Sequence, residues 1–566
     1  MKHIRACLWV LLITCGSTGL SATSVIDVPV SPELQESFSI YGEPELIEIT
    51  DRVYLAFAFD WVNCLFVIGD DGVIVIDTLF RVENAEKALA QLRKVTDKPI
   101  VAVIYSHGHP DHTGGVRAFV PEGQESEVSI YASSAWPRYR RELASPLYPM
   151  MIRRPLEQYG FPLIPPGTER FEHVLGPINP TARTGSYVSP NHNVSKATRV
   201  TLAGIEMELV PIPSELDDEL LVWIPGEDVA YAADTMAHVF PWLSSPRNEP
   251  YRSPRGLVKA KHIMLDWQPE HLVVGHGPAF HGEDTVQKSL TNHRDAEQTL
   301  IDQTIAAINA GKTRDEAAES VKLPSHLANE PILNDTYHRA SVMIKGLYTR
   351  YSGWYGNEAL EMIQHSPREE AKRMVLLAGG ADQLLKKAQT ALKEGDYPWA
   401  AQLATYLILV DQRDDAAKRV KIEAFKSIAM RTHTISERNY LLSGVLSLQR
   451  GKVMMPPFWY ANQSDMVPTS EFIEFLGPRL DLKRSAEKML KVNLVISDTG
   501  ENFRLTVRRG VLARRQGQHQ EPDLTLEMDR PSLIAFASKQ DSTEELMREK
   551  RIKSIGDAAQ FLELFN

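Results

Sequence analysis

Apolar residues in the first half of the chain follow the pattern of short strands that alternate with helices. Residues 73–78 (VIVIDT) and 100–104 are continuous β-branched runs, which are typical of strands buried on both faces. Between them, residues 84–95 carry apolar side chains at helical spacing. This pattern predicts a mixed α/β region. Further strands are predicted at 53–58, 64–68, 200–202, 205–211, 220–224, 229–232 and 271–274.

The stretch 121–198 interrupts this pattern and is rich in Pro, Arg and Tyr. We predict a loop-rich insertion, of the kind in which substrate pockets are often built. Its apolar side chains could bind an apolar substrate, or they could simply belong to the hydrophobic core. They are Tyr139, Leu147, Tyr148, Met150, Met151, Tyr159 and Phe161.

Residues 291–450 change to helical periodicity. Two amphipathic segments, 381–393 and 397–410, are joined at the sequence EGDYPWAA, which resembles the turn of a helix pair. Helix pairs of this kind often carry contacts between subunits.

Beyond residue 450 the pattern becomes that of a small α+β domain. Residues 491–497, 502–515 and 523–529 alternate apolar and polar side chains, which predicts strands. The segments 531–538 and 543–564 are predicted to be helices.

The first 22 residues have the order of an export signal: a basic start, an uncharged stretch of 11 residues, and then small residues. An uncleaved anchor, or a lipoprotein modified at Cys15, are the alternatives. No later segment has the length and apolarity of a membrane span. We therefore expect an exported protein, periplasmic or secreted, in which Cys64 is the remaining thiol. The predicted organisation is a signal (1–22), an α/β domain (23–290), a helical domain (291–450) and a C-terminal α+β domain (451–566).

Charge limits the partners that the protein can bind. The chain has 62 basic and 73 acidic residues, which gives a formal net charge of −11. A protein this acidic does not hold nucleic acid by its bulk charge. An anionic substrate would need arginines gathered locally.

The densest chemical signal is the sequence SHGHPDHTGG, which follows the buried strand at 100–104. It places His107, His109, Asp111 and His112 within six positions. Imidazole and carboxylate are preferred ligands of divalent transition metals such as zinc. Alternate residues of an extended turn point in different directions, so one loop could serve two adjacent metals.

Further ligands must come from other strand ends. Glu215 precedes a predicted strand, Asp234 ends one (VAYAADT), and His276 ends another (VVGHGP). His238, four residues after Asp234, is a fourth candidate. His276, held between two glycines after an apolar run, is the strongest of the four.

These motifs resemble the metallo-β-lactamase superfamily over residues 45–285. Glu215 lies nineteen residues before Asp234, where most of the superfamily has histidine, and a glutamate there is a mark of its alkyl sulfatase branch. The sequences GWYGN (353–357), LAGGAD (377–382) and ERNYLLSG (437–444) look like the helical dimerisation domain of bacterial alkyl sulfatases. The last 110 or so residues look like their sterol-carrier-like domain. The resemblance implies an α/β fold: a metallo-β-lactamase αββα sandwich, an all-α dimerisation domain and a small α+β domain.

The resemblance also implies roles for individual residues. It places His107, His109 and Glu215 at one zinc, and Asp111, His112 and His276 at the other. Asp234 is the implied bridging carboxylate, in a position where alkyl sulfatases typically have glutamate. Arg247 matches the sulfate-binding arginine, with Arg252 nearby, and Asp77 would orient a metal ligand.

The resemblance implies a zinc-dependent hydrolase that uses a metal-activated water on dodecyl-sulfate-like alkyl sulfates and releases alcohol and inorganic sulfate. The catalytic residues would be Asp111, Asp234 and Arg247, with Arg247 and Arg252 binding the small amphiphilic anion. A homodimer through the helical domain is also implied. The alternatives are a hydrolase of another ester (lactone, thioester or phosphoester) and a lipid- or surfactant-binding protein.

Overall fold

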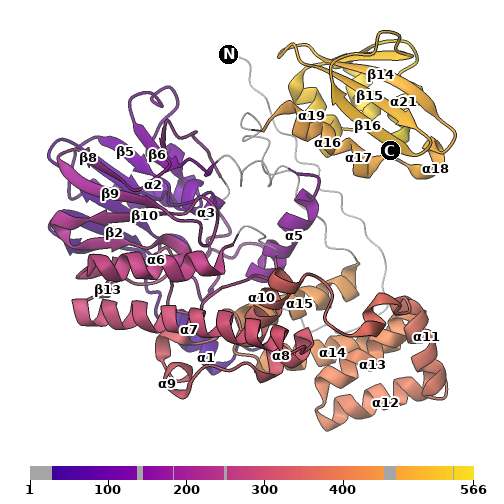
Figure 1. The fold of residues 1–566 in the computed structure, drawn as a ribbon, viewed down its shortest axis with the longest axis horizontal. Helices are drawn as coiled ribbons and strands as arrows, with labels where there is room; N and C mark the ends of the chain where they lie inside the picture. Colours follow the sequence, from indigo (N-terminus) through magenta and orange to yellow (C-terminus); the bar gives the residue numbers. More distant parts are fainter. Residues whose placement is uncertain are drawn as a thin grey trace.

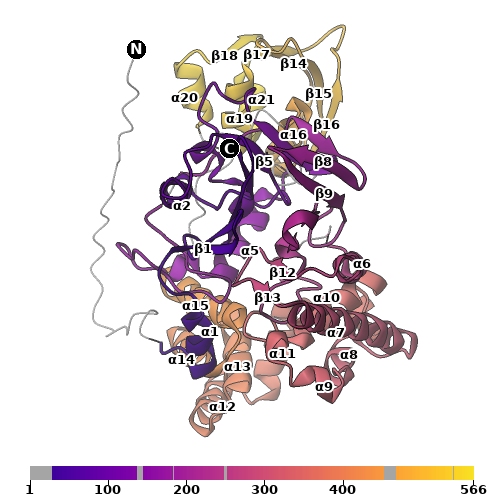
Figure 2. The same cartoon turned by 90° about the vertical axis from the view of Figure 1, so that its left-hand side faces the viewer.

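The structure is a computed structural model, and it describes residues 28–136, 145–182, 184–247, 252–451, 467–539 and 541–565. The predicted export signal, with Cys15, and Tyr139 lie outside the described residues. In Figures 1 and 2 the helical region and the C-terminal domain lie at opposite ends of the molecule, with the two-sheet region between them in Figure 2. Among the described residues, no helix is long and apolar enough to cross a membrane.

The first sheet has seven strands in the order β1-β2-β3-β4-β5-β6-β7. Its central strands β4 and β5 pair in parallel and are almost wholly buried, as their β-branched runs predict. The strands are β1 (Glu45–Thr50), β2 (Val53–Phe57), β3 (Cys64–Ile68), β4 (Val73–Ile76), β5 (Ile100–Ile104), β6 (Ser129–Ser133) and β7 (His192–Val194).

The second sheet has six strands in the order β13-β12-β11-β10-β9-β8. Four of its pairings are antiparallel, and only β11 and β12 run parallel. The strands are β8 (Thr198–Leu202), β9 (Ile205–Pro211), β10 (Leu220–Ile224), β11 (Val229–Tyr231), β12 (His271–Val273) and β13 (Phe280–His281).

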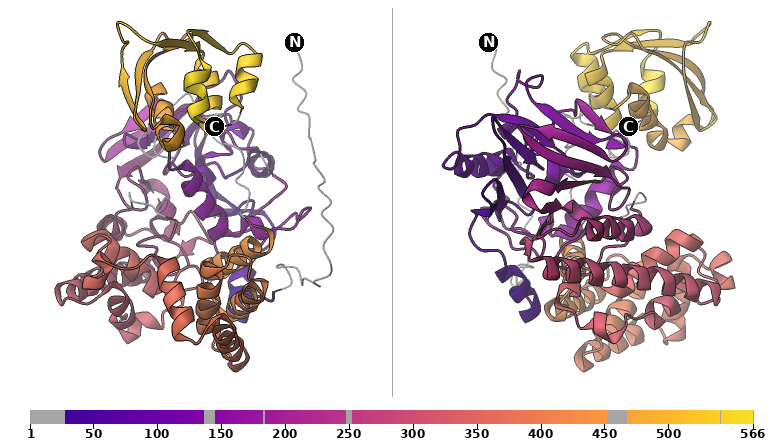
Figure 3. Two further views of the ribbon diagram at one scale, coloured as in Figure 1. Left: turned by 90° about the vertical axis from the view of Figure 1, so that its right-hand side faces the viewer. Right: turned by 60° about the vertical axis from the view of Figure 1, so that its left-hand side comes forward.

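The two sheets pack face to face through one apolar core, to which Leu55, Ile74 and Ile104 contribute from the first sheet and Leu209 and Val222 from the second. A further core covers the outer face of each sheet. The helices on these outer faces are α2 (Val82–Leu92) on one side, and α6 (Pro254–Trp267) and α7 (Glu283–Asn309) on the other. The helix α1 (Pro32–Ser39) lies below the two-sheet region in Figures 1 and 2 and contributes Leu34 to the first of these cores. The αββα layering, visible in Figure 3, confirms the predicted fold class.

The stretch 121–198 contains more regular structure than its proline-rich sequence predicts. It supplies the last two strands of the first sheet, β6 and the edge strand β7, and the helix α5 (Tyr148–Tyr159), in which Pro155 is internal. Residues from α5 join two other parts of the molecule. Tyr148 and Ile152 belong to the apolar core of the C-terminal domain, and the Asn439 side chain of α15 (Ile435–Arg450) donates to the Gln158 carbonyl at 2.9 Å.

The second half is helical up to residue 451, as predicted, and α12 and α13 form the expected pair. The helices, besides α7 and α15, are α8 (Arg314–Ser320), α9 (Ser325–Ala328), α10 (Ala340–Ser352), α11 (Pro367–Leu377), α12 (Ala381–Glu394), α13 (Tyr397–Val410) and α14 (Asp415–Arg431).

The C-terminal domain is a five-stranded sheet in the order β16-β15-β14-β17-β18, with short helices on one face. Its strands are β14 (Met489–Ile496), β15 (Asn502–Arg508), β16 (Val511–Gln516), β17 (Leu524–Met528) and β18 (Ile552–Ile555). Its helices are α16 (Thr469–Glu474), α17 (Leu476–Arg479), α18 (Leu482–Ser485), α19 (Arg530–Ser538), α20 (Thr543–Arg548) and α21 (Ala559–Leu562).

The prediction of one helical segment over 543–564 was wrong. The chain leaves α20 at Lys550, whose φ of 57° is left-handed, and forms β18 before turning again at Gly556 (φ 104°). Pairing of β18 with the edge of β17 provides backbone hydrogen bonds that a local helical pattern does not reveal.

Candidate metal centre

The histidine motif lies at the carboxyl end of β5, at the edge of the first sheet. His107 and His112 are fully buried, and His109 is the residue before the one-turn helix α3 (Pro110–Thr113). The two glycines that follow allow the motif to pack closely on the sheet. A Cβ on Gly114 would lie 2.2 Å from the Phe80 carbonyl oxygen, and a Cβ on Gly115 would lie 2.1 Å from that of Thr78. The motif therefore needs glycine at both positions.

The other predicted ligands come to the same place from the second sheet. Glu215 lies in the β9–β10 connection, Asp234 in the single turn after β11, and His276 after β12. The structure brings these residues and the motif into two groups that could each hold a metal ion. One group is His107, His109, Glu215 and Asp234, and the other is Asp111, His112 and His276.

Asp234 lies between the two groups. Its carboxylate oxygens are 3.9 Å from His107 Nε2, 3.3 Å from His112 Nε2 and 3.3 Å from His276 Nε2. Asp111 Oδ2 is 3.7 Å from the same nitrogens of His112 and His276. A single carboxylate within reach of histidines from both groups has the geometry of a bridging ligand.

The charges of this buried cluster fit a cation. Burial lowers the pKa of His107 well below its usual range, and His112 and His109 lower it further, so this ring is held neutral as a ligand must be. Burial would raise the pKa of Asp234, but His276 and His112 bring it well below its usual range. Four imidazoles and several carboxylates shielded from water are a donor set suited to divalent transition metals.

Asp77 orients His112, one of the clustered histidines. Its Oδ2 accepts from His112 Nδ1 at 2.6 Å, from the Tyr231 hydroxyl at 2.6 Å and from the Ser106 hydroxyl at 2.7 Å. Its Oδ1 accepts from the Ser106 backbone N–H at 2.8 Å. These contacts turn Nε2 of His112 toward Asp234 and Asp111.

Glu219 is a residue of the site that the sequence analysis missed. Its side chain is fully buried, with Oε1 3.5 Å from His107 Nδ1 and 3.3 Å from the Asp234 backbone N–H nitrogen. Burial raises the pKa of Glu219 well above its usual range, and the charge of Asp234 adds to the effect. The acidic run SELDDEL is the only signal for it, and nothing in that run distinguishes Glu219 from its neighbours.

Arg247 and Arg252 both converge on Glu215. Arg252 is buried, and its guanidinium donates to Glu215 Oε1 and, at 2.5 Å, to the Trp242 carbonyl. Arg247 Nη2 lies 3.5 Å from the same Glu215 oxygen, and Nη1 donates to the Tyr159 hydroxyl. The guanidinium carbon of Arg247 also lies 5.3 Å from the centre of the Tyr159 ring. The predicted basic point therefore adjoins the first metal group.

An aromatic wall, formed by Trp61, Tyr159, Trp242 and Tyr337, stands beside His276 and Arg247. The Trp61 carbonyl accepts from His276 Nδ1 at 2.6 Å, and Trp242 Nε1 donates to the Asp234 carbonyl at 2.9 Å. The rings of Trp61 and Tyr159 lie 4.6 Å apart. Except for Tyr159, sequence reasoning did not find these side chains, because they come from separate loops.

A cavity of about 850 Å³ opens on the Arg252 side, against the helical region. It is lined by Arg154 of α5, by Ser244, Ser245 and Arg252, and by Lys345 and Arg350 of α10, among others. Its basic lining suits an anion.

His238 does not join either metal group. Its Nε2 lies 2.7 Å from the Pro278 carbonyl oxygen, and its ring stacks on Phe280 at 4.0 Å. It packs the loop that carries His276.

Family models cover most of the chain in the predicted order. The metallo-beta-lactamase superfamily matches residues 60–262, alkyl sulfatase dimerisation matches 313–451, and the alkyl sulfatase C-terminal model matches 461–566.

Curated relatives and a solved structure agree with these models. A linear primary-alkylsulfatase of a Pseudomonas strain is 30% identical over 488 residues, which span 83% of this chain and 92% of the relative. An (R)-specific secondary-alkylsulfatase of Pseudomonas is 28% identical over 95% of this chain and 82% of its own length. The structure of the inverting sec-alkylsulfatase Pisa1 from Pseudomonas superposes with a TM-score of 0.82 at 26% identity, covering 96% of this chain and 88% of that one.

Proposed function

The chain belongs to the alkylsulfatases, hydrolases of the metallo-β-lactamase fold, and from this premise we propose that it hydrolyses alkyl sulfate esters. Water and the ester would give an alcohol and hydrogen sulfate. The observation that carries the proposal is the position of Arg247, whose guanidinium reaches Glu215 of the first metal group and so stands at the edge of the cluster.

We propose that the cluster binds two divalent metal ions, zinc by preference. His107, His109 and Glu215 would hold one, Asp111, His112 and His276 the other, and Asp234 would bridge them. Bound metal would supply a water activated at neutral pH and a Lewis acid for the ester. Asp77 would keep His112 oriented toward its ion.

Arg247 would bind the sulfate group. A guanidinium can donate two parallel hydrogen bonds to an oxyanion, and exclusion of water strengthens them. The Tyr159 hydroxyl, which accepts from Arg247, would keep the guanidinium in place before substrate arrives. Arg252 remains a proposed sulfate contact, although its contacts with Glu215 and the Trp242 carbonyl suit it equally to holding Glu215 in position.

We propose that the protein is a homodimer, as the dimerisation model over 313–451 suggests. Within that region, Trp354, Ile363, Leu376 and Leu377 are apolar and 65–81% exposed. Large apolar side chains with this exposure are available for burial between subunits. Sedimentation of a Leu376→Asp/Leu377→Asp variant, compared with the unchanged chain, tests whether it separates the subunits.

Export to the periplasm or beyond stays a proposal that rests on the first 22 residues. Determining the N-terminal residue of the mature protein after expression of the whole chain would test it.

A substrate panel tests the activity. Zinc-loaded protein should release sulfate from dodecyl sulfate and leave a lactone, a thioester and a phosphoester of similar chain length largely unreacted. Asp234 favours the second candidate, a hydrolase of another ester, because aspartate is the bridging residue of the broader superfamily. Faster turnover of the lactone, the thioester or the phosphoester than of dodecyl sulfate would establish this second candidate. Absence of both turnover and bound metal would favour a surfactant-binding protein.

A further inference from the structure

The outer face of the C-terminal sheet collects positive charge. The inner face packs on the short helices, with Leu494, Leu505 and Leu526 in the core. On the outer face, cross-strand register arranges the side chains of β14, β15 and β16 in three rows. The rows are Met489–Arg508–Val511, Lys491–Thr506–Ala513 and Asn493–Arg504–Arg515.

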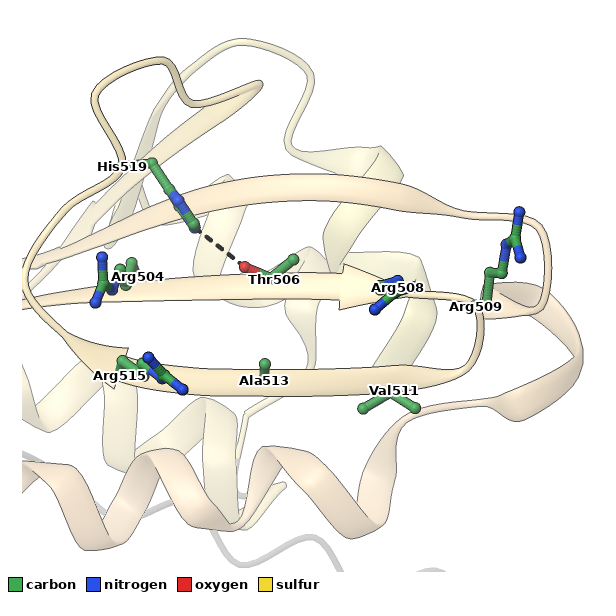
Figure 4. A pocket seen from close by; sticks show the side chains of 8 residues that line it. All are labelled: Arg504, Thr506, Arg508, Arg509, Val511, Ala513, Arg515 and His519. Carbon is green, nitrogen blue, oxygen red and sulfur yellow. Dashed lines mark hydrogen bonds between the residues drawn. The ribbon is translucent and has the colours of Figure 1, made fainter.

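Four arginines border a hollow of about 610 Å³ on this face (Figure 4). Arg504 and Arg515 lie at one end, and Arg508 and Arg509 at the turn between β15 and β16. His519 folds over from the following loop, with Nε2 3.2 Å from the Thr506 hydroxyl. We refer to Lys491 and the four arginines as the arginine face.

The arginine face lacks acidic partners. Within the described part of the chain, none of its five basic side chains forms an ion pair or a side-chain hydrogen bond. Arg514, which alternates to the other face, does pair with Glu474 at 2.8 Å. Arg504 and Arg515 are directly opposite in register, an arrangement of like charges that costs stability unless an anion lies against it.

The C-terminal domain has no net excess of positive charge, but several of its basic side chains gather on the arginine face. Residues 467–566 hold 16 basic and 16 acidic residues, so the net −11 of the chain is carried by the remainder. At physiological salt, electrostatic interactions are screened over about 8 Å. The electrostatic field at this face is therefore set mainly by its own arginines and not by distant acidic residues.

Exposed apolar side chains adjoin the arginines at the turn. Met489 is 60% exposed, Val511 is 62% exposed, and both flank Arg508 in the same row. Leu482 of α18, 68% exposed, lies next to the turn, with its Cδ2 atom 3.8 Å from the place that a Cβ on Gly510 would take. Apolar tips next to basic residues match the layering of a lipid interface, in which headgroups lie above acyl chains.

We propose that the arginine face docks the C-terminal domain onto a bilayer that contains acidic phospholipid. The phosphate groups would lie against the arginines, and Val511, Met489 and Leu482 would enter the headgroup region. The three rows contain no Phe, Tyr or Trp on which a nucleic-acid base could stack, which favours lipid over single-stranded nucleic acid. Docking would hold the protein where amphiphiles partition.

Flotation of the full chain with vesicles tests the proposal. We expect binding to phosphatidylcholine vesicles that contain one third phosphatidylglycerol, little binding to pure phosphatidylcholine, and loss of binding at high salt. Each basic residue at an acidic surface contributes a factor of roughly five, so Arg504→Gln/Arg515→Gln should weaken binding by about 30-fold. Lys386→Gln/Lys387→Gln on α12, which removes two exposed charges elsewhere, should bind like the unchanged chain.

Several results would overturn the proposal. Equal binding to both kinds of vesicle, or equal weakening by the two double variants, would remove the arginine face from the interaction. Tighter binding to DNA or to polyphosphate than to acidic vesicles would mean that the arginine face binds a soluble polyanion and not a membrane. A change of oligomeric state in Arg504→Gln/Arg515→Gln would make the face an interface between copies. Thermal unfolding confirms that each variant is folded, and no turnover is measured, so the outcome is independent of the proposed hydrolysis.

Discussion

The metal centre and the arginine face both concentrate charged side chains, but they do so under opposite conditions. At the metal centre the side chains are buried, and acids and imidazoles lie within a few ångströms of each other. On the arginine face they are of one sign, and all are exposed except Arg504, which is partly buried. A buried charge is stable only where partner charges or hydrogen bonds replace its lost hydration. Water and salt screen the charges of surface arginines, so these reduce the folding free energy only slightly. Substitutions should therefore have large effects at the first place and small effects on folding at the second.

The largest effect is expected from Asp234→Asn. Loss of the proposed bridging charge should release bound metal and lower the rate of sulfate release by about three orders of magnitude. Metal analysis of the purified protein and a sulfate assay measure the two effects. Asp228→Asn is the matched control, at an exposed turn whose φ of 51° asparagine also adopts. Full metal content in Asp234→Asn would contradict the bridging role.

Arg247→Ala should keep its metal but bind the anionic ester poorly. Loss of charge-assisted hydrogen bonds should lower kcat/KM by roughly a hundredfold, mainly through KM. Steady-state kinetics on dodecyl sulfate, together with metal analysis, provide the test. Unchanged kinetics would place the sulfate elsewhere.

Asp77→Asn should weaken metal binding by between about ten and a hundredfold, because His112 loses its carboxylate acceptor. Asparagine tolerates the left-handed backbone at this position (φ 57°), so the effect would come from the hydrogen bonds and not from strain. Titration of the apoprotein with zinc measures the affinity, and an unchanged affinity would reduce Asp77 to a packing role.

The smallest effect is expected on the arginine face. Arg504→Thr removes one of two opposed like charges and should stabilise the folded protein by a few tenths of a kcal/mol. Denaturant unfolding at low salt gives the free-energy change, which should shrink as salt is added. A clear loss of stability would mean that the Arg504 stem contributes more packing than its charge costs.

Much of the first half could be predicted because its signals are local. The β-branched runs at 73–78 and 100–104 became β4 and β5, and four of the predicted ligands lie within six positions of one loop. Predictions failed where a distant partner decides the structure. Residues 552–555 form a strand because β17 offers a free edge, and α5 forms despite Pro155.

By itself the sequence indicated a mixed α/β first half through apolar periodicity, the histidine loop through residue type, and Glu215, Asp234 and His276 as candidate ligands through their positions at strand ends. The αββα sandwich followed only from the resemblance of these motifs to the metallo-β-lactamase superfamily. Only the tertiary structure decided that Glu219 supports His107, that Arg247 and Arg252 meet at Glu215, and that Arg504 opposes Arg515. These contacts depend on loop paths and strand register between segments distant in sequence. Local periodicity places a side chain on a face, but it does not specify which side chain lies opposite.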